Sequence, residues 1–79
     1  MIHARIQEVF QEVFNVAECQ LTTSIHSIAG WDSLGHVKLI LGLEKKFSLK
    51  LPFHEAVQLR DVKTIQEYLI HRGIVKVGS

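Results

Sequence analysis

The sequence has a single cysteine, a single proline and no long hydrophobic run among its 79 residues. Cys19 alone excludes an internal disulfide and fits a reducing compartment. No basic cluster surrounds it, so we interpret it as a small filler residue. The longest unbroken aliphatic stretch, Leu39-Ile40-Leu41, is far shorter than the roughly 20 residues that span a bilayer. Because the N-terminus also lacks a secretory pattern, we expect a cytoplasmic protein that does not bind membranes.

Charge of one sign is also scarce, since nine Lys and Arg residues stand against eight Asp and Glu residues. A net charge of +1 gives no field that would favour nucleic acid. The histidines are scattered without the spacing of a zinc site, and we expect them at the surface: His3, His26, His36, His54 and His71. A chain of this length predicts one domain with one modest core.

What is present is helical periodicity. From Ile2 to Ala17, apolar residues recur every three or four positions, which predicts an amphipathic helix. Residues 18–32 predict a long loop, which a few apolar side chains hold onto the core: Leu21, Ile25 and Ile28.

A second helix is predicted over Ser33–Phe47, because Asp32 or Ser33 can cap its first turn and no proline interrupts it. Apolar residues cover most of its circumference, so we expect it to pack against two or three neighbours, with Leu34 facing the core. The remaining arc, predicted to face solvent, holds Gly35, Lys38, Gly42, Lys45 and Lys46.

The alternation in residues 49–52 could indicate a short strand, but Pro52 better suits the first position of a short helix that continues over residues 53–57. Asp61 is expected to cap a last helix that Gly73 ends. The inward face of this helix is predicted to be Val62, Ile65, Leu69 and Ile70. The sequence thus predicts an all-α fold, a small four-helix bundle with three long helices and one short one. It forms a single domain, 1–79, ordered over about 2–73, with a frayed tail at 74–79.

Asp32-Ser33-Leu34 taken alone is typical of an ordinary helix start. The wider stretch GWDSLGHVKLILGLEKKFSLKLP, followed by the capped segment VKTIQEYL, resembles the acyl carrier protein family of phosphopantetheine-binding carrier domains. The similarity runs in register from about Ile25 to Arg72, and the first helix agrees in length and pattern.

This resemblance implies a monomeric carrier that catalyses nothing itself. Ser33 would receive 4′-phosphopantetheine from coenzyme A through a phosphopantetheinyl transferase with Mg²⁺, and the arm's thiol would hold an acyl group as a thioester. Asp32 matches the acid that helps place the transferase's metal, and Leu34 matches the residue that anchors the first helical turn. An acyl-loading ligase or acyltransferase and downstream pathway enzymes would be the other partners. The physics is consistent, because a helix N-terminus favours the phosphodiester anion.

Two features depart from typical members of the family. Trp31 replaces a small residue, and we interpret it as an apolar lid on the loop. Lysines occupy the strip of the second helix that is usually acidic, and charge complementarity governs the choice of partner. We therefore predict a specialised biosynthetic pathway whose enzymes contact Gly35, His36, Lys38, Gly42, Lys45 and Lys46. His36 either bonds the phosphate of the arm or is an ordinary surface histidine.

Other classes of protein fit less well. An unmodified helical interaction module, or a small DNA-binding bundle, is the main alternative, although three lysines offset by nearby acids do not make a recognition helix. A serine hydrolase would need glycine at position 31 in its G-x-S-x-G elbow, where this chain has Trp31. A Ser33–His36 pair also lacks a separate acid that would orient the histidine.

Overall fold

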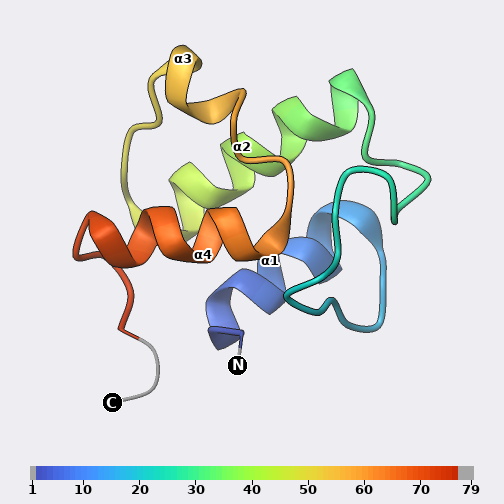
Figure 1. Cartoon of the computed structure of the whole chain (residues 1–79). Coiled ribbons are helices and arrows are strands. Elements are labelled where there is room, and N and C mark those ends of the chain that lie inside the picture. The colour runs from blue at the N-terminus through green and yellow to red at the C-terminus, as the bar shows by residue number, and fades with distance from the viewer. Residues whose placement is uncertain (1, 77–79) are drawn as a thin grey trace.

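The computed structural model describes residues 2–76, and within that range it contains four α-helices and no strand (Figure 1). The helices are α1 (Ala4–Phe14), α2 (Ser33–Phe47), α3 (Phe53–Ala56) and α4 (Val62–His71). The predicted all-α fold, with three long helices and one short one, is confirmed. None of the helices in the described range is long and apolar enough to cross a membrane.

Helix α1 is shorter than its apolar pattern. The His3 ring caps its start, with Nδ1 accepting from the Arg5 amide at 3.1 Å. The helix ends at Asn15, whose φ of 55° is a left-handed conformation that asparagine tolerates. Ala17, which fits the helical spacing, therefore lies beyond the helix and is exposed.

Helix α2 has the predicted bounds. The Asp32 carboxylate accepts from the Gly35 amide at 2.9 Å, and Ser48 ends the helix in a left-handed conformation. Its inner face buries Leu39 and Leu43 completely and packs on α1, the most extensive helix pair in the described chain. This inner face belongs to a core shared by α1, α2, α4 and the loops.

The prediction that Leu34 of α2 faces the core is wrong, although α2 does share the core with α1 and α4. Leu34, Val37 and Leu41 are 65%, 54% and 59% exposed, so Leu34 does not face the core. The apolar pattern runs around the helix, but the core covers only part of its circumference. Apolar periodicity therefore identified the helix without identifying its buried face.

Two local bonds position α3 and α4. Pro52 immediately precedes α3, one residue earlier than predicted, and Asp61 accepts from the Thr64 amide at 2.7 Å as the predicted cap of α4. The Tyr68 hydroxyl of α4 donates to the Glu55 carboxylate of α3. The pKa of Tyr68 is raised, chiefly by burial and secondly by this hydrogen bond. The short helix is thereby fastened to the long one.

The C-terminal part of α4 differs from the prediction in two respects. Ile70 is 41% exposed, because the inward face follows Ile65 and Leu69. Gly73 ends the region with φ 74°, as expected of a terminator, but the chain does not fray there. The amides of Ile74 and Val75 donate to the Leu69 carbonyl, and Val75 is only 3% exposed. The end of the predicted tail, residues 77–79, lies outside the described residues.

The long loop between α1 and α2 is held at several points. Ile25 donates its amide to the Arg60 carbonyl at 2.9 Å, and Val62 donates to the Thr23 carbonyl at 2.9 Å, so the loop runs beside the start of α4 (Figure 1). The predicted apolar anchors are partly buried against the core: Leu21, Ile25 and Ile28. This arrangement fixes the segment that leads into α2.

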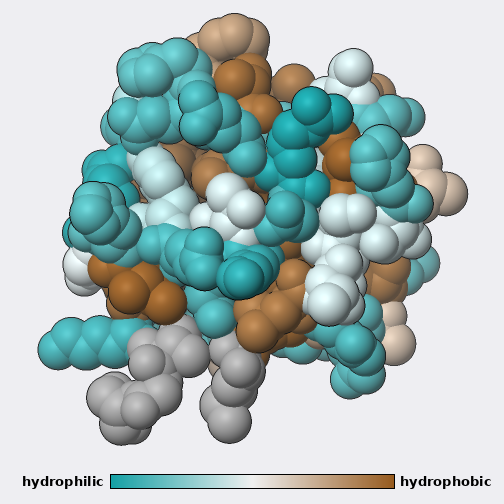
Figure 2. Space-filling model, in the orientation of Figure 1, coloured by the Kyte–Doolittle hydropathy of each residue, from teal (hydrophilic) through white to brown (hydrophobic). Residues whose placement is uncertain are grey.

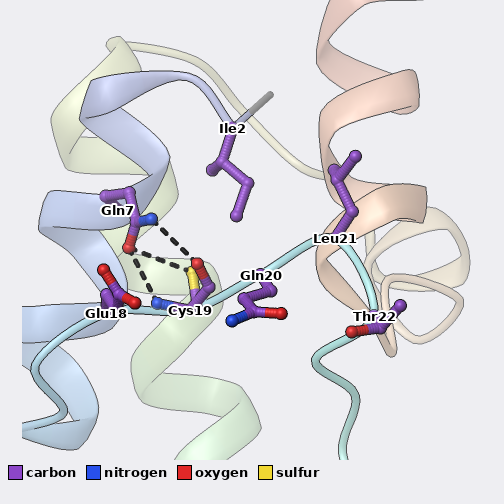
Figure 3. Close-up of a pocket in the computed structure, with 7 residues that line it drawn as sticks. All are labelled: Ile2, Gln7, Glu18, Cys19, Gln20, Leu21 and Thr22. Atoms are coloured by element: carbon purple, nitrogen blue, oxygen red, sulfur yellow. Dashed lines mark hydrogen bonds between the residues drawn. The ribbon is translucent and has the colours of Figure 1, made fainter.

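Cys19 lies at the other end of this loop. The Gln7 side chain of α1 accepts from the Cys19 amide at 2.9 Å and donates to its carbonyl at 2.8 Å (Figure 3). Burial raises the pKa of the Cys19 thiol to about 11. The thiol stays protonated near neutral pH, which agrees with its interpretation as a filler residue.

Candidate functional site

The site centres on Ser33, the first residue of α2, whose side chain is exposed. Among residues 2–76, no acceptor faces the amides of Ser33 and Leu34, whereas Asp32 serves the next two amides, those of Gly35 and His36. Free amides at a helix N-terminus favour an anion. The hydroxyl of Ser33 thus stands where a negatively charged product would be stabilised.

Both glycines of α2 have structural roles, and neither is exposed as the predicted solvent-facing arc requires, while their contact with partners stays a prediction. Gly35 is buried, and a Cβ there would lie 2.0 Å from the Gly30 carbonyl oxygen, because the loop crosses directly over the first turn of α2. At Gly42 a Cβ would approach the side chains of Val9 and Val13 to 3.2 Å. Both glycines therefore allow close approach of backbone, one to the loop and the other to α1.

Trp31 is more than a lid, since it is 2% exposed and belongs to the core. Its ring packs against Phe10 and Phe14 of α1, with ring centroids 5.3 and 5.6 Å apart. Its indole Nε1 donates to His36 Nδ1 at 3.0 Å. Trp31 therefore joins the loop to α1 and α2 next to Ser33.

His36 is half-buried rather than an ordinary surface residue. Its Nδ1 accepts from Trp31, so Nε2 carries the hydrogen of the neutral ring and donates to the Ala56 carbonyl at 2.8 Å. Both ring nitrogens are occupied within the protein, and neither is free for a phosphate or a partner. His36 is therefore not an ordinary surface histidine, since it ties the start of α2 to α3, and its contact with partners stays a prediction.

The three lysines of α2 do not form one surface. Lys46 lies 3.3 Å from both Glu8 and Glu12 of α1, and these hydrogen bonds raise its pKa. Its prediction as a partner contact is therefore not supported, because it joins two helices. Lys38 and Lys45 are exposed and have no ion pair within residues 2–76.

A hollow of about 600 Å³ adjoins Ser33. Its wall is largely apolar and comes from four segments of the chain: Ile25, Asp32, Ser33, His36, Val37, Phe53, Val57 and Arg60. Arg60 adds a cation to the same hollow as the Ser33 hydroxyl. No sequence pattern indicated Arg60, Phe53 or Val57, because only the fold brings them close to Ser33.

This combination defines a class of protein, a small helical domain that presents a serine at the start of its second helix. The chain matches the model of the family described as phosphopantetheine attachment site over residues 4–69, and it belongs to this family. Members carry covalently attached 4′-phosphopantetheine, and the chain is a phosphopantetheine-bearing carrier domain. Such domains work with phosphopantetheinyl transferases and biosynthetic enzymes, and they are generally not catalysts themselves.

The residues around Ser33 suit this group. An exposed hydroxyl can accept a bulky arm, and the two free amides can face its phosphate. The adjoining hollow offers Arg60 for the anion and apolar walls for the alkyl parts of the arm. The site thus combines donors for a phosphodiester with an apolar wall for the chain attached to it.

Proposed function

We propose that Ser33 is the residue to which 4′-phosphopantetheine is attached. The observation that carries this proposal is the exposed hydroxyl at the first position of α2, beside two amides without acceptors in the described chain. The product is a phosphodiester, and its negative charge is favoured at the positive end of the helix dipole.

Attachment requires one displacement at phosphorus. The Ser33 oxygen attacks the pantetheine-side phosphorus of coenzyme A, a new P–O bond forms, and the pyrophosphate P–O bond breaks. Adenosine 3′,5′-bisphosphate leaves, and the hydroxyl proton passes to a base of the transferase. Asp32 supports the step from the carrier side, since only one of its carboxylate oxygens bonds to Gly35 and the other is open to the transferase's metal. Leu34, being exposed, contributes to contact with the transferase rather than to the core.

The loaded domain then acts as a carrier in the cytoplasm. The thiol at the end of the arm holds an acyl, aminoacyl or polyketide group as a thioester, and partner enzymes do all the chemistry. We place this carrier in a specialised pathway rather than in primary fatty acid synthesis. The exposed lysines of α2, Lys38 and Lys45, support this placement, because enzymes that present basic faces to acidic carriers would be repelled.

Intact-mass measurement tests the attachment. The protein is incubated with a broad-specificity phosphopantetheinyl transferase, coenzyme A and Mg²⁺, and we expect a mass increase of one phosphopantetheine. Ser33→Ala should abolish the increase. Ser48→Gly is the matched control, because it removes an exposed hydroxyl at the other end of α2 and suits the positive φ there. An unchanged mass for the parent protein would favour an unmodified interaction module instead.

The pathway is tested on the loaded protein. A malonyl transferase of fatty acid synthesis with a basic docking face should transfer malonyl to this carrier much more slowly than to an acidic carrier. If transfer were efficient and did not decrease at low salt, the result would favour a role in primary fatty acid synthesis instead.

A further inference from the structure

An exposed strip runs along α2 on the side opposite α1. Its apolar members, Leu34, Val37 and Leu41, follow a spacing of three and four residues and are each more than half exposed. Phe53 of α3, on the hollow that Val37 also lines, is 82% exposed. Figure 2 shows one face of the molecule, on which hydrophobic surface occurs in small patches separated by hydrophilic side chains. Large apolar side chains gathered on one helix face indicate a contact surface.

The free charges of this strip are positive. Lys38 lies one turn after Leu34, and Lys45 lies one turn after Leu41; neither has an ion pair in the described chain. Three carboxylates lie near the strip, and each accepts a hydrogen bond within the fold, so the charges on the strip itself are those of the two lysines. Asp32 accepts from Gly35, Glu44 accepts from the Leu51 amide at 2.8 Å, and Glu55 accepts from Tyr68.

Lys46 of the same helix is an example of a lysine whose charge is paired with carboxylates within the protein. It points to the opposite side of α2, where Glu8 and Glu12 of α1 both bond it. The α1 surface that meets α2 therefore combines apolar side chains, Val9 and Val13, with two carboxylates. A surface of the same composition would complement the outer strip.

Resting on the proposed function, we propose that the strip of Leu34, Val37, Lys38, Leu41 and Lys45 docks partner enzymes whose face is an apolar groove rimmed by carboxylates. Ser33 stands at the N-terminal end of the strip, so an enzyme seated on it lies next to the arm. Apolar contact supplies affinity, and the two lysines select the partner by charge.

Other occupants of the strip fit the charges less well. In a symmetric dimer through this strip, the same lysines of two copies would face one another, which is repulsive. An anionic lipid surface would attract the lysines, but it would repel the phosphodiester carried on Ser33. A protein with carboxylates placed around an apolar groove would attract the two lysines and cover the apolar side chains between them.

The experiment uses two phosphopantetheinyl transferases of known structure, one with an acidic rim around its docking groove and one with a basic rim. The kcat/KM for attachment is measured on the full chain at low and high salt. We expect the acidic-rimmed enzyme to be preferred. The double substitution Lys38→Glu, Lys45→Glu should lower its kcat/KM by about tenfold at low salt and raise that of the basic-rimmed enzyme. Salt should shrink both effects.

Matched controls lie on α4. Lys63→Glu changes an exposed lysine that belongs to a different surface, and it should leave both enzymes nearly unaffected. Leu41→Gln should slow both enzymes several-fold, whereas Ile70→Gln, at another exposed apolar residue, should not.

The outcomes separate the two proposals. If neither transferase modifies Ser33, the proposed function fails and the docking proposal falls with it. If Ser33 is modified but the lysine inversions act no more strongly than Lys63→Glu, the docking proposal alone is overturned. The docking proposal would also be overturned if the protein sedimented as a dimer, or if the loaded protein sedimented with anionic vesicles, and the same lysine inversions abolished that behaviour. The strip would then have another occupant.

Discussion

The two faces of α2 use the same residue type for different purposes. On the inner face Leu39 and Leu43 are completely buried, whereas Leu34 and Leu41 on the outer face are more than half exposed. The inner leucines stabilise the fold as part of the core, whereas the outer ones remain largely in contact with solvent. Their retention on the surface is best explained by contact with other proteins.

The strongest way to break this comparison is to truncate one leucine on each face. Leu39→Ala should lower the free energy of unfolding by about 2–5 kcal/mol, because it leaves a cavity in a closed core. Leu41→Ala should change it by less than about 0.5 kcal/mol. Urea unfolding followed by circular dichroism measures both variants. Equal losses would show that the outer face also supports the fold.

The two glycines of α2 allow a second test with one substitution. Gly35→Ala should cost about 3 kcal/mol, because its Cβ meets the backbone carbonyl of Gly30, which cannot move without shifting the loop. Gly42→Ala meets only the methyl groups of Val9 and Val13, and the gain in helix propensity of about 1 kcal/mol should nearly offset that crowding. Thermal unfolding distinguishes them. A destabilising Gly42→Ala as large as Gly35→Ala would contradict this account.

A smaller effect is expected at the Trp31–His36 hydrogen bond. Trp31→Phe keeps an aromatic ring against Phe10 but removes the indole donor, which should cost about 1 kcal/mol. The control is a double-mutant cycle with His36→Phe. If the bond is the source of the loss, the two substitutions together should cost less than the sum of their separate effects, and strict additivity would argue against it.

The smallest effect concerns the two neighbouring lysines. Lys46→Met should lower Tm slightly at low salt by removing the ion pairs with Glu8 and Glu12, and Lys45→Met should not. The pKa of Lys46 lies above its ordinary 10.5, so its contribution is complete below that pH and is lost as the pH rises through the folded value. A difference between parent and Lys46→Met that persists at high salt or at higher pH would point to packing instead.

Much of the helical framework could be predicted because its signals are local. The bounds of α2 follow from Asp32 as a cap, and α4 begins after Asp61 for the same reason. The end of α1 was less accessible, since Asn15 interrupts a pattern that continues to Ala17. Ser33 could be singled out through the resemblance to carrier domains, which needed the wider stretch from about Ile25 to Arg72.

What the sequence could not provide was the orientation of α2. Apolar residues surround this helix, so its periodicity does not distinguish Leu34 from Leu39. Gly35 lies inward because of a loop that the sequence does not place, and Lys46 meets acids more than 30 residues away in the chain. His36 likewise depends on Ala56, 20 residues further along. These facts belong to tertiary structure, which local patterns do not encode.

The enclosed indole gives the protein a built-in optical reporter. Trp31 is the only tryptophan, it is two residues from Ser33, and it is wedged between two phenylalanines and an imidazole. Its fluorescence therefore originates from one place, where the loop meets α1 and α2. Emission spectra recorded during arm attachment would reveal, without any added dye, whether the interior responds to events at the neighbouring hydroxyl.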